Sequence, residues 1–179
     1  MLEELGWRLD LQTCMEIFVG KAVLDERARI EAETGRPVTP EWMAEFRVRR
    51  NAALEAQVGA IAGAVQAVAA VHASAQGRIA CASGADRVKV EMQLQKVGLW
   101  PYLQGRVFSG HEMPRSKPHP DVYLAAAQSL GVPAGRCAVV EDTATGIAAG
   151  VAAGATVFAY APAGQGDLSL IHISEPTRL

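Results

Sequence analysis

Two adjacent carboxylates, Glu141 and Asp142, directly follow the apolar run Cys137–Val140. Such a continuous run is typical of a strand buried on both faces, as in a parallel sheet, and ligands of open α/β sheets bind at the carboxyl ends of the strands. Adjacent carboxylates repel each other unless a cation or hydrogen-bond donors separate them, and Mg²⁺ prefers such oxygen ligands. The pair therefore indicates a magnesium site. The alternative, that Asp142 only caps the following helix, is equally compatible with these residues.

Two more polar residues follow apolar segments. Ser83, beside Gly84, ends the strand-like segment Arg78–Ser83, and a small hydroxyl at a helix start suits an anionic oxygen. Lys117 lies in a turn that two following prolines restrict, where an ammonium group can neutralise a phosphoryl group as a point charge. Taken singly, Ser83 could simply cap the next helix, and an exposed lysine is the commoner outcome. A hydroxyl, a cation and metal-binding carboxylates at one sheet edge together indicate a phosphoryl-transfer site.

The elements that must position these residues alternate along the chain. The pattern predicts four strands, Arg78–Ser83, Arg106–Ser109, Cys137–Glu141 and Thr156–Ala159, and three intervening helices, Asp86–Val97, Pro120–Leu130 and Thr143–Ala153. Strands that alternate with helices of this length indicate right-handed βαβ units. We therefore expect an α/β fold with a Rossmann-like parallel sheet and helices on both faces.

Glycines at 146, 150 and 154 fall on one face of the last of these helices. Glycine lets two backbones approach closely, so we expect this face to pack tightly on the sheet. We interpret it as a structural feature and not as a binding site.

The first third of the chain has a helical pattern and no strand pattern. Helices are expected up to Phe18, over Ala22–Glu33, and over Glu41–Val58, where Thr39 is the N-cap. A further helix over Ala60–Ser74 leads into the first strand.

Composition excludes several classes of protein. The chain has 179 residues, of which 50% are hydrophobic and 20% charged, with a net charge of −2. This charge favours neither nucleic acid nor an anionic membrane as a partner, and no apolar run reaches the ~20 residues of a membrane span. The three cysteines are far apart, and Cys81 and Cys137, which lie in apolar strand patterns, are expected as buried, reduced thiols. We expect a cytoplasmic protein and a monomer.

The C-terminal segment Leu168–Arg178 reads like the translation of a synthetic adapter used to prepare DNA for sequencing. A natural tail is the alternative. We expect residues 163–179 to form a tail that contributes little to the fold, as an adapter scar would.

Three motifs carry a family resemblance: Cys-Ala-Ser-Gly-Ala around Ser83, Ser-Lys-Pro-His-Pro-Asp around Lys117, and Val-Val-Glu-Asp-Thr-Ala-Thr-Gly around Asp142. In order and spacing they resemble the second, third and fourth motifs of the haloacid dehalogenase-like hydrolases. The similarity is strongest to the capped branch with sugar-phosphate phosphatases, phosphoglycolate phosphatase and β-phosphoglucomutase. It implies a partial helical cap over residues 1–58 and an α/β core over residues 59–162.

The resemblance also implies Mg²⁺-dependent hydrolysis of a small phosphorylated metabolite through an aspartyl-phosphate. Ser83 and Gly84 would bind the phosphoryl oxygens, Lys117 would steady phosphate and nucleophile, and Asp142 with Glu141 would bind Mg²⁺. Lys21 falls near where caps of this branch contact substrate. A phosphomutase is the alternative within the enzyme class, and a non-catalytic phosphate- or metal-binding protein is the alternative outside it.

The sequence departs from the family pattern at the first motif. The family's nucleophile lies in an Asp-x-Asp motif at the end of an N-terminal strand, and nothing here matches: Leu9–Leu11 has a single acid and no strand before it. We therefore expect a fragment whose core lacks the first strand, and a chain that is inactive as it stands.

Overall fold

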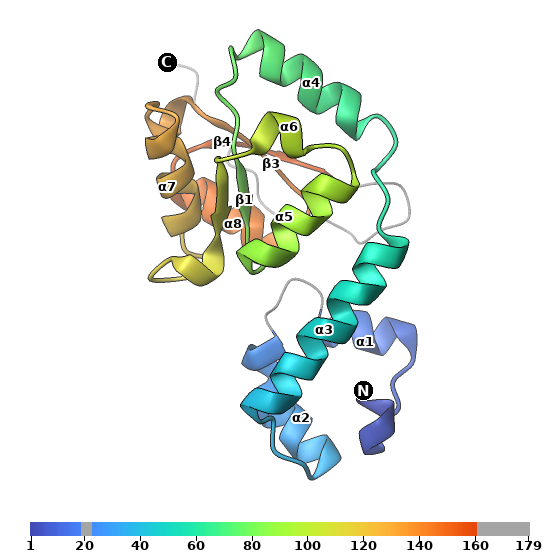
Figure 1. Cartoon of the computed structure of the whole chain (residues 1–179). Helices are drawn as coiled ribbons and strands as arrows, with labels where there is room; N and C mark the ends of the chain where they lie inside the picture. The colour runs from blue at the N-terminus through green and yellow to red at the C-terminus, as the bar shows by residue number, and fades with distance from the viewer. Residues whose placement is uncertain (19–22, 161–179) are drawn as a thin grey trace.

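Helices and short parallel strands alternate along the second part of the chain (Figure 1). The computed structural model describes residues 1–18 and 23–160. The helices are α1 Leu11–Phe18, α2 Arg27–Thr34, α3 Pro40–Gln57, α4 Ala64–Ser74, α5 Arg87–Lys96, α6 Trp100–Leu103, α7 Asp121–Ser129 and α8 Ala144–Ala152. The strands are β1 Cys81–Ser83, β2 Val107–Ser109, β3 Ala138–Glu141 and β4 Thr156–Ala159. The predicted α/β fold with parallel strands is confirmed.

The four strands form two separate pairs. β1 pairs with β2 in parallel, with Cys81 opposite Val107, and β3 pairs with β4 in parallel, with Ala138 opposite Thr156. Within the described residues no sheet pairing joins β1 to β3. The single continuous sheet that the alternation of elements suggests is therefore divided in the middle.

The β1–β2 pair has helices on both faces. Cys81 and Val107 pack in one cluster with Val90 of α5, whereas the next residues, Ala82 and Phe108, pack in a second cluster that includes α7. Because successive strand residues point to opposite faces, α5 and α7 cover opposite faces of this pair. This part of the predicted layering is confirmed.

The β3–β4 pair is covered on one face only. Val139 is buried and packs with Ala149 of α8. Val140 and Phe158 on the opposite face are 73% and 57% exposed. The expectation that the run Cys137–Val140 is buried on both faces is therefore wrong for the described residues, because none of their elements covers the face of Val140.

Glycine lets α8 approach this pair closely. A Cβ at Gly150 would lie 2.8 Å from Val157 Cγ2 and 3.4 Å from Val139 Cγ1, so the predicted close packing is confirmed there. Gly154 has a different role. It lies just after α8 at φ +78°, and nothing would lie within 4 Å of a Cβ there, so it ends the helix in the left-handed conformation.

Helices α1 to α3 lie together below the α/β part in Figure 1. Their core consists of Ile30, Val38 and Met43, with the Trp42 and Phe46 rings stacked 5.8 Å apart beside it. The Thr39 side chain accepts a hydrogen bond from Trp42 N, as expected of the N-cap of α3.

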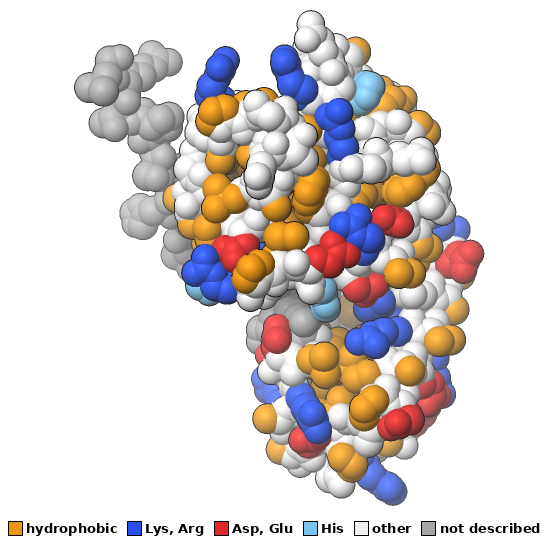
Figure 2. Space-filling view, turned by 60° about the vertical axis from the view of Figure 1, so that its left-hand side comes forward, with side chains coloured by type: hydrophobic (Ala, Val, Ile, Leu, Met, Phe, Trp, Pro, Cys, Tyr) orange, Lys and Arg blue, Asp and Glu red, His pale blue; other side chains and the backbone are white. Residues whose placement is uncertain are grey.

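One ion pair connects α3 to the α/β part. Arg50 donates to Asp86 at 2.9 Å, and Asp86 also caps α5 by accepting from Lys89 N at 3.0 Å. In Figure 2, positively and negatively charged side chains are interspersed near the junction of the two parts.

Local differences from the predicted elements have backbone causes. α4 begins at Ala64 and not at Ala60, because Gly63 precedes it in the left-handed conformation. α2 begins at Arg27, after a 3₁₀ turn over Val23–Glu26, and the short α6 was not predicted. Over residues 1–18 and 23–160, no helix combines the length and apolar character needed to cross a membrane.

Candidate active site

Lys117 lies at the carboxyl ends of both strand pairs. Its Nζ donates to the Ala82 carbonyl at 3.3 Å, to the Tyr123 hydroxyl at 2.9 Å and to Glu141 Oε1. Ala82 belongs to β1 and Glu141 ends β3, so one ammonium group connects the two sheets. These bonds use the three hydrogens of the ammonium, and only 10% of the side chain is exposed.

Glu141 is the anchor for Lys117. Oε1 also accepts from the Tyr123 hydroxyl at 2.7 Å, while Oε2 accepts from Asp142 N, Thr143 N and Thr143 Oγ1. Burial raises the pKa of Glu141, but the hydrogen bonds from Lys117 and then Tyr123 outweigh burial and hold this pKa below its usual value. The carboxylate is therefore ionised at neutral pH, and both of its oxygens are occupied.

Gly146 makes room for this carboxylate. Any Cβ at position 146 would overlap the carboxyl group of Glu141. Thr143 begins α8 as its N-cap, since its Oγ1 accepts from Gly146 N at 3.1 Å. The first turn of α8 is thus built around Glu141.

The Tyr123 hydroxyl links the cation and the carboxylate. It comes from the first turn of α7 and lies between Lys117 and Glu141. Burial, followed by the hydrogen bond to Glu141, raises the pKa of Tyr123 above its usual value near 10. The phenol therefore stays protonated and acts as a donor to Glu141.

Hydrogen bonds between Ala85 and two serine side chains fix the loop after β1. Ser83 Oγ accepts from Ala85 N at 3.1 Å, and the fully buried Ser109 donates from Oγ to the Ala85 carbonyl at 2.7 Å. Gly84 is exposed at this loop. The N-cap of α5 is Asp86, so the alternative in which Ser83 caps that helix does not apply.

Asp142 has an exposed side chain that makes no hydrogen bond or ion pair with the part of the chain that the structure describes. Because Thr143 is the N-cap of α8, the alternative role of Asp142 as a cap does not apply either. Asp142 is left as an open carboxylate next to the Lys117–Glu141 centre.

Sequence reasoning singled out Ser83, Lys117, Glu141 and Asp142, and the structure brings their segments together through the contacts of Lys117. Lys21 lies outside the described residues. Tyr123, Thr143 and Gly146 are further parts of the site that the sequence motifs did not predict. A tyrosine six positions after Lys117, in the first turn of a helix, was the available signal.

These residues supply only some of the ligands that a metal ion needs. No cluster of three or more His, Cys, Asp or Glu suited to a metal occurs in residues 1–18 and 23–160. Glu141 is occupied by five donors, so Asp142 is the carboxylate at this edge with free oxygens. The site therefore fits Mg²⁺ with one side-chain ligand from this chain, which agrees with the preference of that ion for one or two carboxylates plus water and phosphate.

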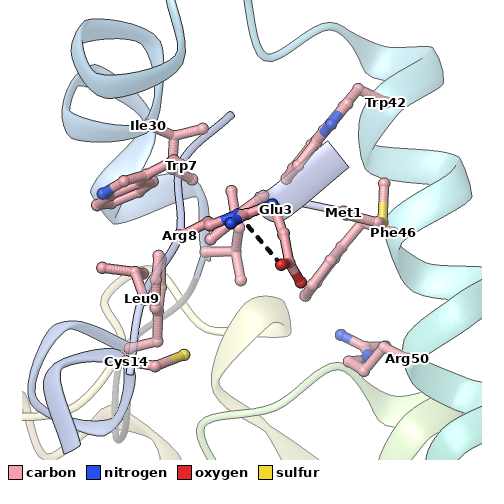
Figure 3. Close-up of a pocket in the computed structure, with 13 residues that line it drawn as sticks. Met1, Glu3, Trp7, Arg8, Leu9, Cys14, Ile30, Trp42, Phe46 and Arg50 are labelled. Atoms are coloured by element: carbon pink, nitrogen blue, oxygen red, sulfur yellow. Dashed lines mark ion pairs between the residues drawn. The ribbon is translucent and has the colours of Figure 1, made fainter. Parts of the chain in front are cut away.

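A pocket lies among the N-terminal helices (Figure 3). It has a volume of about 480 Å³. Its walls include Trp7, Trp42 and Phe46, and the Glu3–Arg8 ion pair lies across it at 3.4 Å. It has no cation–carboxylate–hydroxyl arrangement like that around Lys117, so the edge of the strand pairs is the candidate active site.

Parallel strands whose carboxyl ends meet at a lysine, a hydrogen-bonded glutamate and an exposed aspartate define an α/β protein with a charged strand edge. A family model described as haloacid dehalogenase-like hydrolase matches residues 3–154. The chain therefore belongs to the haloacid dehalogenase-like hydrolases, as its motifs predicted.

The chain is similar to 6-phosphogluconate phosphatase of Escherichia coli, with 26% identity over 89% of this chain and 71% of that protein. A haloacid dehalogenase family hydrolase from Deinococcus radiodurans, solved with bound phosphate and sodium, is 34% identical with a TM-score of 0.64, covering 87% of this chain and 68% of that one. CbbY from Rhodobacter sphaeroides, in complex with xylulose-1,5-bisphosphate, shares the fold with a TM-score of 0.71 at 22% identity, covering 87% and 73%. The chain spans between 7% and 40% of the length of the first curated relatives it matches.

Proposed function

We propose that this chain carries the phosphate- and metal-binding half of a phosphoric monoester hydrolase that acts on a small phosphorylated metabolite. The single observation behind the proposal is the position of Lys117, whose ammonium contacts Ala82 beside Ser83 and Glu141 beside Asp142. A phosphoryl group at this edge would meet the hydroxyl of Ser83, the positive charge of Lys117 and a metal on Asp142. These are the parts that phosphoryl transfer requires for charge stabilisation.

Each side chain has a separate role in this proposal. Lys117 is fixed by three hydrogen bonds, of which the one to Ala82 is the longest at 3.3 Å, so a phosphate oxygen would replace this contact at least cost. Glu141 and Tyr123 hold the ammonium in place, and Asp142 binds Mg²⁺. When bound, Mg²⁺ neutralises charge on the phosphoryl oxygens. Relatives named 6-phosphogluconate phosphatase and hexitol phosphatase A support a sugar-phosphate-like substrate.

The covalent step needs a nucleophile that the described residues do not supply at this edge. An incoming aspartate would attack phosphorus and break its bond to the ester oxygen, which leaves as an alcohol after taking a proton; water would then hydrolyse the aspartyl-phosphate. Electrostatic stabilisation by Lys117 and Mg²⁺ does not replace this step. We therefore propose that the chain alone binds phosphate without turning over esters. We place the protein in the cytoplasm as a monomer, in line with its free cysteines.

Calorimetric titration of inorganic phosphate in the presence of Mg²⁺ tests the binding role. Phosphate should bind to the wild-type chain, and Lys117→Met should weaken binding at least tenfold. Asp142→Asn should remove the dependence on Mg²⁺ while leaving weak binding in EDTA unchanged. Arg115→Met is the control, because Arg115 is exposed and its guanidinium pairs with Asp121 and not with Lys117 or Glu141. Equal binding by wild type and Lys117→Met would contradict the proposal.

Turnover of p-nitrophenyl phosphate with and without EDTA tests the absence of a nucleophile. The chain alone should release no nitrophenol above the protein-free rate. EDTA-sensitive turnover by the unmodified chain would show that it contains a nucleophile of its own. If the chain turns over, a second assay with a sugar phosphate as substrate distinguishes hydrolysis, which releases free phosphate, from mutase activity, which yields a rearranged sugar phosphate.

A further inference from the structure

The pocket among the N-terminal helices has the size and the walls of a small-molecule site. Its volume of about 480 Å³ lies within the range of about 300–1,000 Å³ that is usual for ligand pockets. Figure 3 shows Trp7 on one side of the pocket and Trp42 with Phe46 on the other. The rings of Trp42 and Phe46 are nearly parallel, with an angle of 4° between their planes. Flat aromatic walls of this kind favour a planar aromatic ligand.

Arg50 brings unused hydrogen-bond donors to the wall of this pocket. Its side chain is only 22% exposed, and its guanidinium carbon lies 5.7 Å from the centre of the Phe46 ring. Nε and Nη2 donate to the Asn51 side chain, and Nη2 also donates to Asp86. Nη1 has no acceptor in the part of the chain that the structure describes. A guanidinium has five N–H groups, so the two on Nη1 are available to a ligand.

The charges around the pocket favour an anionic ligand. Among the described residues, the other charged side chains of the lining are Glu3 and Arg8, which form an ion pair with each other. Asp86 pairs with Arg50 but does not line the pocket. Arg50 is therefore a positive charge at the wall without a carboxylate beside it inside the pocket. Charge-assisted hydrogen bonds from a guanidinium suit the oxygens of a carboxylate or a sulfonate.

We propose that this pocket binds a planar aromatic acid, with its rings between Trp7 and Trp42 and its anionic group on Nη1 of Arg50. The lining shares no residue with the candidate active site, so the inference does not rest on the proposed function. The anion of the ligand and the carboxylate of Asp86 would share one positive charge. Removing the charge of Asp86 should therefore strengthen binding of the acid.

Two fluorescent probes with the same ring system test the pocket. Anilinonaphthalene sulfonate carries an anionic group, phenylnaphthylamine lacks it, and the full chain should bind both in saturable titrations. Arg50→Met keeps an apolar side chain but removes the charge, so it should weaken binding of the sulfonate about tenfold and change binding of the neutral probe by less than about twofold. Asp86→Asn is the matched control, because it breaks the same ion pair but keeps the cation. This variant should bind the sulfonate at least as tightly as the wild type.

Alkylation of cysteines locates the bound probe. Cys14 lines this pocket, whereas Cys137 lines a separate apolar cavity between the two strand pairs. Bound sulfonate should slow the reaction of Cys14 with iodoacetamide severalfold, measured by peptide mass spectrometry, and should protect Cys137 less.

The same titrations separate this pocket from the candidate active site. An excess of inorganic phosphate should leave the sulfonate bound. The proposal would be overturned by failure of the chain to bind the sulfonate, by equal weakening of both probes in Arg50→Met, or by protection of Cys137 that matches that of Cys14. Displacement of the sulfonate by phosphate would overturn it as well.

Discussion

The Lys117 ammonium and the Glu141 carboxylate form an ion pair in which only 10% and 9% of the two side chains are exposed. Removing one partner leaves a buried charge without compensation, which typically costs about 3–5 kcal/mol. Lys117→Met and Glu141→Gln should therefore each lower the free energy of unfolding by several kcal/mol in urea denaturation. The double variant Lys117→Met/Glu141→Gln should lose less than the sum of the two single variants. Additive losses would mean that the two groups are not energetically coupled.

Tyr123 should remain protonated at pH values where an ordinary tyrosine ionises. Burial and the hydrogen bond to Glu141 raise the pKa of Tyr123 in the folded state. Protonated Tyr123 therefore stabilises the fold below the unfolded-state pKa of about 10. This contribution is lost as the pH rises from there through the higher folded-state pKa. In the native protein, Tyr123→Phe should leave the phenolate absorbance change up to about pH 11 unaltered. In guanidinium chloride, where the chain is unfolded, the phenolate absorbance change of the same variant should be smaller by the contribution of one of the 3 tyrosines. An equal decrease in the absorbance change of the native variant would contradict the direction of the pKa shift.

Gly146→Ala should disturb the site more than a substitution at a comparable glycine. Its Cβ would overlap the Glu141 carboxyl group, which five donors hold in place, and overpacking of this kind typically costs about 1–3 kcal/mol. Gly59→Ala is the matched control, because nothing lies within 4 Å of a Cβ there and its φ is not positive. Thermal unfolding should show a clear fall in Tm for Gly146→Ala and little change for Gly59→Ala. Similar Tm values for both variants would argue against tight packing at Gly146.

Asp86 combines two roles that substitutions can separate. Asp86→Asn keeps an oxygen to cap α5 but removes the ion pair with Arg50, and partly exposed pairs contribute about 0–1 kcal/mol. Asp86→Ala removes both and should cost about 1 kcal/mol more, the usual value of an N-cap. Urea denaturation of the two variants measures the difference. Equal instability of the Asn and Ala variants would contradict the separation of the capping role from the ion pair.

Much of the site could be predicted from the sequence because its residues belong to local motifs. Ser83, Lys117 and the Glu141–Asp142 pair each follow a strand or lie in a restricted turn, and the sequence alternates strands with helices. The covalent order of such elements determines that polar residues after parallel strands meet at one edge. Thr39 as an N-cap and Gly150 as a packing glycine followed from local rules of the same kind.

The tertiary structure decided which partner each of these groups has. The sequence places Tyr123 in the first turn of a helix six positions after Lys117, but it does not determine that the hydroxyl bridges Lys117 and Glu141, because those contacts join residues from separate elements. It also does not determine that Glu141 is fully occupied while Asp142 stays open. The division of the strands into two pairs is likewise a long-range property, since pairing depends on which strand edges meet in space and not on the apolar character of each segment. An apolar run such as Cys137–Val140 shows that a strand is suited to burial, whereas only its neighbours in the fold determine whether both of its faces are covered.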